Sequence, residues 1–217
     1  MAVCNKMPIF VRLQRMKPIF AILFSCVGLL AGCKQDDTVL TTQQTSTVRY
    51  LESGHTPRLM SEDAAKESID ENPEYYTVYG HGEAYRYIAT MYDEGRDART
   101  EIEAGDTADI YFDAYVFNYA SLANAAPYWS NREETIAALE QTGGGLNIEY
   151  WSVDPLALRA GGRALKGISR ALIGCREGDR VEVYMTYKAA YGSGIVGVVP
   201  KESPVAWFFT VEKVTKH

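Results

Sequence analysis

The residues of this sequence with the clearest potential for chemistry lie in a loop near its C-terminal end. Residues 189–204 carry Tyr191, Val198 and Val199, where a solvent-exposed loop usually carries small polar residues. The segments on both sides alternate between apolar and polar residues, which predicts two core strands. Apolar side chains in a loop between two such strands predict a lined pocket for an apolar group of a ligand.

Three other sequence patterns could indicate a binding site, but the surrounding residues argue against each of them. Residues 192–197 spell G-x-G-x-x-G, but Val-Val-Pro follows instead of a helix, so a dinucleotide site is rejected. The histidines are scattered without metal-ligand spacing, and neither a metal nor a cofactor is expected; they are His55, His81 and His217. The 15 tyrosines suggest an aromatic face for sugars or peptides, but most fall in predicted strands, where they commonly complete a sheet surface.

Three short motifs in this region resemble those of FKBP-type peptidyl-prolyl isomerases. They are Tyr191-Gly192, Val198-Val199-Pro200 and Phe209-Thr210-Val211-Glu212. Residues 164–185 resemble the helix, turn and strand of the same family, and the resemblance covers residues 84–214. It implies an α+β fold, with an antiparallel sheet of about five or six strands wrapped around one short helix. It also implies isomerase activity on proline-containing polypeptides, without a cofactor, and binding of macrolide inhibitors.

The resemblance further implies a pocket for the proline ring. Ile168 takes the floor position, where many relatives have Trp, and Phe112 stands where an inward Tyr is usual. Trp129 follows Tyr128 where relatives often have an Asp after a Phe. Two polar groups of the pocket, the hydroxyl of the usual Tyr and the carboxylate of the usual Asp, are therefore absent; they are called the polar handles below. Leu165 corresponds to the residue whose backbone N–H donates to the substrate carbonyl. The implied catalytic residues are Tyr191, Phe209, Phe112, Leu165 and Ile168, and the implied substrate-binding residues are Tyr128, Trp129, Val198 and Val199.

Two classes of function stay open at this point. One is a peptidyl-prolyl isomerase that assists the folding of exported proteins, favoured by Tyr191 and the Val-Val-Pro loop. The other is a non-catalytic FKBP-like module that binds polypeptide or scaffolds an envelope complex, favoured by the missing handles. Phe209, Ile168 and Phe112 do not discriminate, because this fold would place them inward in either case.

Residues 1–32 have the composition of a secretory signal peptide. Four basic residues and no acidic one precede an apolar run of about 14 residues, shorter than the ~20 that span a membrane. Leu30-Ala31-Gly32-Cys33 resembles a bacterial lipobox, which implies a lipid on Cys33; a soluble secreted protein is the alternative. The following Lys-Gln-Asp-Asp is similar to the export signal of some Bacteroidetes lipoproteins. It implies a cell-envelope protein, anchored to a bacterial outer membrane and either periplasmic or surface-exposed.

Removal of residues 1–32 changes the charge and the cysteine content. The remaining chain keeps 18 of the 22 basic residues against 28 acidic ones, a net charge of about −10. No basic face is then available for phosphates, which argues against a nucleic-acid partner. With Cys33 acylated, Cys175 is the one cysteine left, so a disulfide within one chain is excluded.

The remaining elements follow from periodicity and composition. The Thr/Gln-rich stretch 33–47 predicts a flexible tether, 48–80 an N-terminal extension and 81–217 the FKBP-like domain. Whether the extension packs on the domain or only spaces it from the membrane is left open. Strands are predicted at 48–51, 75–79, 84–92, 108–117, 180–187 and 205–211, and helices at 62–69 (capped by Ser61), 132–141 and 158–173.

Overall fold

The computed structural model describes residues 38–142 and 151–217. The predicted signal peptide and Cys33 therefore lie outside the described residues. From Leu40 to His217 the chain forms one compact unit. Within the described ranges, none of the helices has the combination of length and apolar composition that a membrane crossing requires.

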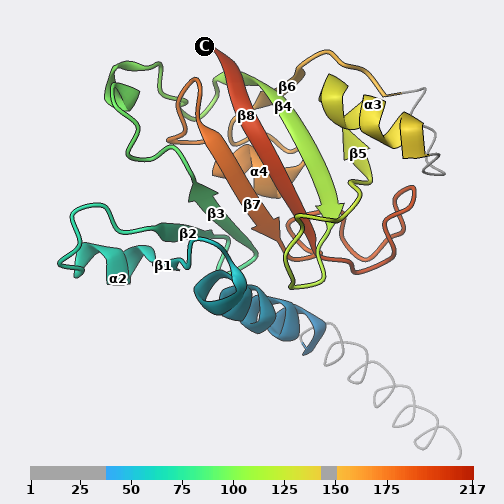
Figure 1. The fold of residues 1–217 in the computed structure, drawn as a ribbon, viewed down its shortest axis with the longest axis horizontal. Helices are drawn as coiled ribbons and strands as arrows, with labels where there is room; N and C mark the ends of the chain where they lie inside the picture. Colours follow the sequence, from blue (N-terminus) through green and yellow to red (C-terminus); the bar gives the residue numbers. More distant parts are fainter. Residues whose placement is uncertain (1–37, 143–150) are drawn as a thin grey trace, which may run out of the picture. The chain divides into compact units, whose positions relative to one another are not determined.

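A single, largely antiparallel sheet of eight strands organises the fold (Figure 1). The strand order is β1-β2-β3-β7-β8-β4-β5, β6 pairs with β4, and only the β1–β2 pair is parallel. The five predicted strands from residue 75 onward are confirmed, and three short ones are added. The strands are β1 (Met60–Ser61), β2 (Tyr75–Tyr79), β3 (Ala84–Ile88), β4 (Thr107–Val116), β5 (Trp129–Ser130), β6 (Leu156–Arg159), β7 (Arg180–Met185) and β8 (Val205–Thr215).

The helices are short, and the predicted helix over 158–173 is wrong in its first half. Residues 158–159 belong to β6, and only the later part is helical, because a tight turn intervenes. Gly161 has φ +73°, and a Cβ on Gly162 would lie 2.8 Å from the carbonyl oxygen of Arg159, so this turn requires glycine. The helices are α2 (Glu62–Lys66), α3 (Glu133–Thr142) and α4 (Lys166–Ala171), with a π-helical turn at Tyr50–Gly54 and a 3-10 turn at Arg96–Ala98.

Helix α4 packs across one face of the sheet and closes the main core. Ile168 and Leu172 of this helical segment are fully buried against inward residues of β4, β7 and β8. Gly167 allows this close approach, because a Cβ there would overlap the sulfur of Met185. The α+β architecture predicted from the sequence, an antiparallel sheet wrapped around one short helix, is confirmed.

The opposite face of the sheet is also buried, which the sequence did not predict. Tyr184 of β7 alternates with the inward residues Val183 and Met185 and so points to the other face, yet it is only 1% exposed. It belongs to a second apolar cluster formed with the N-terminal extension and with residues that follow β4. The buried members of this outer cluster are Tyr50, Leu51, Leu59, Tyr76, Tyr85, Tyr87, Phe117, Leu122, Tyr184 and Ala206.

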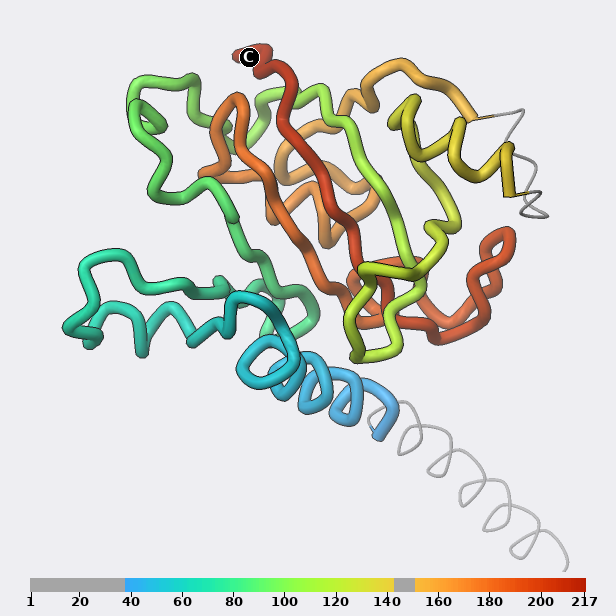
Figure 2. Tube along the Cα trace, in the orientation of Figure 1, coloured from blue at the N-terminus to red at the C-terminus, as the bar shows by residue number. Residues whose placement is uncertain are grey.

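The N-terminal segment departs most from the sequence-based expectation. Residues 38–49 are α-helical instead of a flexible tether, and 48–51 are helical instead of a strand (Figure 2). The side chain of Gln43 donates to the carbonyl oxygen of Glu202 (2.7 Å) and accepts from the backbone N–H of Tyr187 (2.9 Å). These long-range bonds, with the burial of Thr47, stabilise a helix that the local composition alone does not favour. The extension 48–80 also packs on the domain, because Tyr50, Leu51 and Leu59 belong to the outer cluster.

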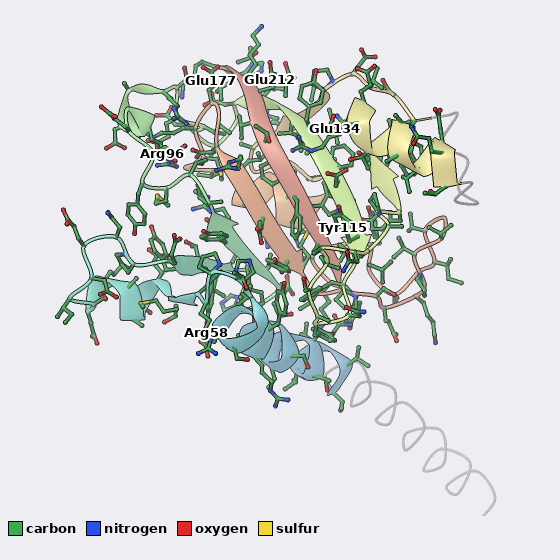
Figure 3. The ribbon with its side chains drawn as sticks, viewed as in Figure 1. Arg58, Arg96, Tyr115, Glu134, Glu177 and Glu212 are labelled. Atoms are coloured by element: carbon green, nitrogen blue, oxygen red, sulfur yellow. The ribbon has the colours of Figure 1, made fainter. Side chains whose placement is uncertain are left out.

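A buried ion pair fixes the loop between β3 and β4. The guanidinium of Arg96 donates two hydrogen bonds to Asp179, at 2.8 and 2.7 Å, and Thr90 adds a third at 3.2 Å. The Asp179 side chain is fully buried. Nearby, Glu177 accepts from Thr100 and from the backbone N–H of Val214, which ties the turn before β7 to the end of β8 (Figure 3).

Candidate functional site

The central residues of the predicted pocket come together on the inner face of the sheet. Phe112 of β4, Phe209 of β8 and Ile168 of α4 belong to one core cluster and are at most 1% exposed. Phe112 and Phe209 are directly paired across the β4–β8 ladder. Their convergence follows from the alternation of the two strands, since inward positions on paired strands share a face.

Trp207 is the one large side chain of this region that the site prediction missed. Its indole is fully buried and stacks on Phe112, with ring centroids 4.3 Å apart and planes at 17°. Trp129 packs edge-on against both rings, at 4.7 Å from Phe112 and 5.5 Å from Trp207. The alternation of β8 placed Trp207 on the same face as Phe209, which was the available signal. An indole thus sits in the site, but it comes from β8 and not from the helix.

Two tyrosine hydroxyls meet at the rim of these rings. The hydroxyl oxygens of Tyr128 and Tyr191 are 2.9 Å apart, and the indole Nε1–H of Trp207 donates to Tyr128 at 3.0 Å. Both tyrosines are half-buried and pack against the core cluster. Burial raises the pKa of both hydroxyls above the usual value for tyrosine. Both phenols are therefore neutral at physiological pH and act as hydrogen-bond groups, not as bases.

The loop that ends in Val-Val-Pro splits into an inward and an outward part. Val199 is 3% exposed and joins the core cluster, whereas Val198 is 59% exposed. Val196 and Val199 exchange two backbone hydrogen bonds, of 3.1 and 2.9 Å, around Gly197 at φ +56°. The structure therefore places Val199 in the wall of the site and leaves Val198 at the loop surface, next to solvent.

Leu165 has a conformation that is uncommon for a residue with a side chain. It precedes α4 with φ +44° and ψ +60°, in the left-handed region. Its carbonyl accepts from Ser169 (2.9 Å), and its backbone N–H finds no acceptor among the described residues. Strained backbone of this kind clusters at functional sites. The donor role that the resemblance implies for this N–H stays a prediction.

A cavity of about 250 Å³ borders the site next to Phe112 and Trp129. Phe112 and Trp129 form one wall, and residues 152–156 form the other. Asn131 holds these walls together, because its Oδ1 accepts from the backbone of Phe112 (2.7 Å) and its Nδ2 donates to Ile110 and Asp154 (2.9 Å each). No grouping of three His, Cys, Asp or Glu side chains within residues 38–142 and 151–217 has the spacing for a metal ion.

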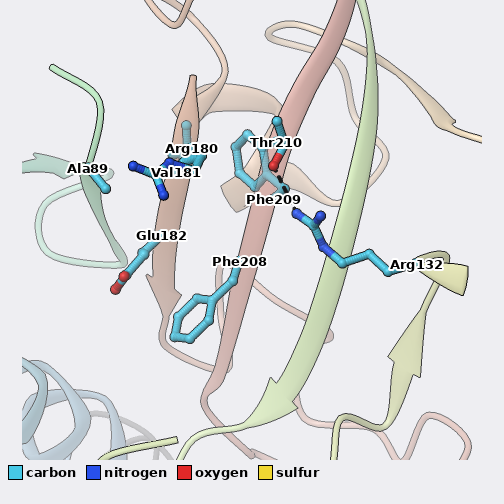
Figure 4. Close-up of a pocket in the computed structure, with 8 residues that line it drawn as sticks. All are labelled: Ala89, Arg132, Arg180, Val181, Glu182, Phe208, Phe209 and Thr210. Carbon is cyan, nitrogen blue, oxygen red and sulfur yellow. Dashed lines mark hydrogen bonds between the residues drawn. The ribbon is translucent and has the colours of Figure 1, made fainter. Parts of the chain in front are cut away.

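A second hollow lies on the opposite face of the sheet, away from the aromatic site. It measures about 260 Å³ and is open to solvent (Figure 4). Arg132 spans one side and donates to the hydroxyl of Thr210 at 2.9 Å. It adjoins another cavity through the shared residues Glu182 and Phe208. None of the predicted site residues except Phe209 lines these hollows.

No family model matches this chain, and no curated protein matches it. Two solved structures to which it is similar are the N-terminal domain of FKBP42 from Arabidopsis thaliana and the three FKBP domains of wheat FKBP73. The first match has 14% identity, a TM-score of 0.44 and covers 69% of this chain and 96% of the other. The second has 13% identity, a TM-score of 0.47 and covers 66% of this chain and 52% of the other, so this chain spans about half of the wheat structure.

Proposed function

We propose that this protein is a peptidyl-prolyl cis-trans isomerase that assists the folding of exported proteins. The observation that carries the proposal is the meeting of Tyr128, Tyr191 and Trp207, from three separate segments, over a buried aromatic floor. This arrangement offers apolar walls together with neutral hydrogen-bond donors. It offers neither a nucleophile nor a general base, and it therefore suits a reaction in which no bond is broken.

Isomerisation of an X-Pro bond is such a reaction. The amide resists rotation by a barrier of ~18–20 kcal/mol because of its resonance, and the uncatalysed change takes ~10–100 s. An apolar site helps by removing the water that stabilises the planar, polar amide. In the proposed complex, the Tyr191 hydroxyl and the backbone N–H of Leu165 donate to carbonyl oxygens of the peptide and hold it while the proline side turns.

The test is a protease-coupled isomerisation assay with the full-length chain in mild detergent. Tyr191→Phe removes one hydroxyl and leaves the ring in place. A neutral hydrogen bond contributes ~0.5–1.5 kcal/mol, so we expect kcat/KM to fall by about two- to tenfold. Tyr115→Phe is the matched control, because Tyr115 packs against the outer cluster on the opposite face of the sheet, and it should leave the rate unchanged. A wild-type chain with no rate above background would refute the proposed function.

A non-catalytic polypeptide-binding or scaffolding module is the second candidate. The two polar handles that are missing at Phe112 and Trp129 favour it. The near-complete burial of Phe112, Ile168 and Phe209 does not discriminate, because side chains at most 1% exposed contribute to the core whether or not a substrate binds. Measuring peptide binding and the isomerisation rate on the same protein distinguishes the isomerase from the binding module. Binding of proline-containing peptides or macrolide inhibitors without acceleration identifies the module. If Phe112→Tyr combined with Trp129→Asp then creates activity, the missing polar handles are the cause.

We also propose that the protein is anchored to the cell envelope through a lipid on Cys33. The proposal is supported by Leu30-Ala31-Gly32-Cys33 and by the basic and apolar composition of residues 1–32. An outer-membrane location, periplasmic or surface-exposed, is the finer part of this proposal and rests on the four residues after Cys33. Fractionation of the two membranes, followed by protease treatment of intact cells, tests it.

A further inference from the structure

A chain of hydrogen bonds runs through the candidate site and ends at Tyr191. The indole nitrogen of Trp207 lies 3.0 Å from the hydroxyl oxygen of Tyr128, which lies 2.9 Å from the hydroxyl oxygen of Tyr191. Neither Trp207 nor Tyr128 is part of the three short sequence motifs that carry the resemblance to the isomerase family. Their role is therefore a separate question from the presence of the pocket.

The distance between the two hydroxyls allows either of them to donate, and their surroundings favour one direction. An indole N–H can only donate, so the Tyr128 oxygen is the acceptor of the first bond. The Tyr128 proton needs an acceptor of its own, since buried polar groups are nearly always paired. Among the described residues, the Tyr191 oxygen is the partner within reach. Tyr128 therefore donates to Tyr191, and the proton of Tyr191 remains available to another acceptor.

The opposite direction would have a different functional consequence. If Tyr191 donated to Tyr128, its proton would be used inside the site, and its oxygen would offer an incoming carbonyl only lone pairs. Hydrogen bonds in series also polarise one another, so a hydroxyl that accepts one bond becomes a better donor in the next. The indole takes one lone pair of the Tyr128 oxygen, and the pairing of the Tyr128 proton with the Tyr191 oxygen then leaves Tyr191 as a donor to the substrate.

We propose that Trp207 and Tyr128 are positioning residues that direct the hydroxyl proton of Tyr191 toward a carbonyl oxygen of the bound peptide. The catalytic part of this inference rests on the proposed isomerase function. The hydrogen-bond chain itself does not, because it is formed without substrate. The two can therefore be tested by separate measurements on the same full-length protein.

The first measurement is NMR of the protein labelled with ¹⁵N-tryptophan. The chain has three tryptophans, and the Trp207 indole signal is assigned by its persistence in Trp129→Phe and in Trp151→Phe. Tyr128→Phe removes the acceptor, so we expect this signal to move upfield and its N–H to exchange faster with solvent. Tyr191→Phe keeps the acceptor and should leave the exchange slow. If Tyr128→Phe changed neither the chemical shift nor the exchange rate of the Trp207 indole N–H, the hydrogen-bond chain would be refuted.

The second measurement is a double-mutant cycle on kcat/KM. Alone, Tyr128→Phe should lower kcat/KM by about two- to tenfold, as expected for one neutral hydrogen bond. In the Tyr191→Phe background the same change should have little further effect, because the hydroxyl that it positions is gone. Independent, multiplicative losses would show a merely structural role and overturn the inference. An inactive wild-type chain would instead refute the isomerase function, and with it the role toward the substrate, while the indole signal still reports on the hydrogen-bond chain.

Discussion

A buried charge pair between the N-terminal extension and the sheet makes the stability of this protein depend on pH. His55 follows the π-helical turn, and its side chain is only 4% exposed. Its Nε2 lies 2.8 Å from a carboxylate oxygen of Glu182, which also accepts from the Tyr184 hydroxyl, and its Nδ1 contacts the carbonyl oxygen of Pro57. Both ring partners are acceptors, so both ring nitrogens donate, which only the protonated imidazole does.

The direction of the pH effect follows from the pKa of His55. Burial lowers this pKa, but the hydrogen bond and charge of Glu182, the Pro57 carbonyl and the charge of Glu74 together raise it above its ordinary value. The rings of Tyr50, Tyr87 and Tyr184 enclose the imidazole and remain neutral. A raised folded-state pKa means that the stabilisation is complete below about pH 6.5 and is lost as the pH rises through the folded-state pKa.

The perturbation is His55→Gln, which removes the positive charge and keeps a polar side chain. A hydrogen bond to a charged group contributes ~1.5–3 kcal/mol. At pH 5.5 we therefore expect the melting temperature to fall by about 3–12 °C, and at pH 8.5 the difference should shrink. Thermal unfolding followed by circular dichroism measures both values, with His217→Gln as the control at an exposed histidine. A difference that stays constant or grows with pH would refute the assignment of a charged His55.

Three further predictions concern other parts of the chain. Asp179→Asn should destabilise the fold by ~3–5 kcal/mol, because it leaves the buried guanidinium of Arg96 without its counter-charge; urea unfolding measures this, and a loss below ~1 kcal/mol would contradict it. Cys33→Ala should abolish incorporation of a fatty-acid analogue, and equal labelling of both proteins would exclude the anchor. Limited proteolysis should leave a fragment that begins near residue 40, whereas a first stable cut after residue 60 would show that the helical segment does not protect the chain.

The central part of the fold could be predicted because apolar and polar residues alternate along its strands. In β8 and β4 the apolar positions recur every second residue, and both strands lie where the pattern placed them. The N-terminal cap of α2 was equally readable, since the Ser61 hydroxyl accepts from the backbone N–H of Ala64. These two elements could be predicted because the signal for each lies in neighbouring residues of the sequence.

The N-terminal helix could not be predicted because its stability comes from distant residues. Threonine and glutamine in 38–47 give no apolar stripe, and the bonds of Gln43 reach residues more than 140 positions away in the chain. The same reason hides the second buried face of the sheet. Tyr184 looked like a surface residue of an alternating strand, but the outer cluster encloses it once the extension is in place. An alternating pattern identifies two faces and does not say that one of them is exposed.

The pocket residues were found by resemblance, whereas the indole donor of the site comes from Trp207, which the resemblance does not assign. The resemblance assigns Ile168 to the floor, and the structure adds a buried indole to the same core cluster, supplied by Trp207. Because this indole comes from β8, its N–H reaches the Tyr128 hydroxyl. The hydroxyl of Tyr128 then connects that donor to Tyr191. The buried rings of Phe112 and Trp207 and the hydrogen-bonded phenols of Tyr128 and Tyr191 thus come together only through the tertiary fold, which explains why the sequence alone did not show this arrangement.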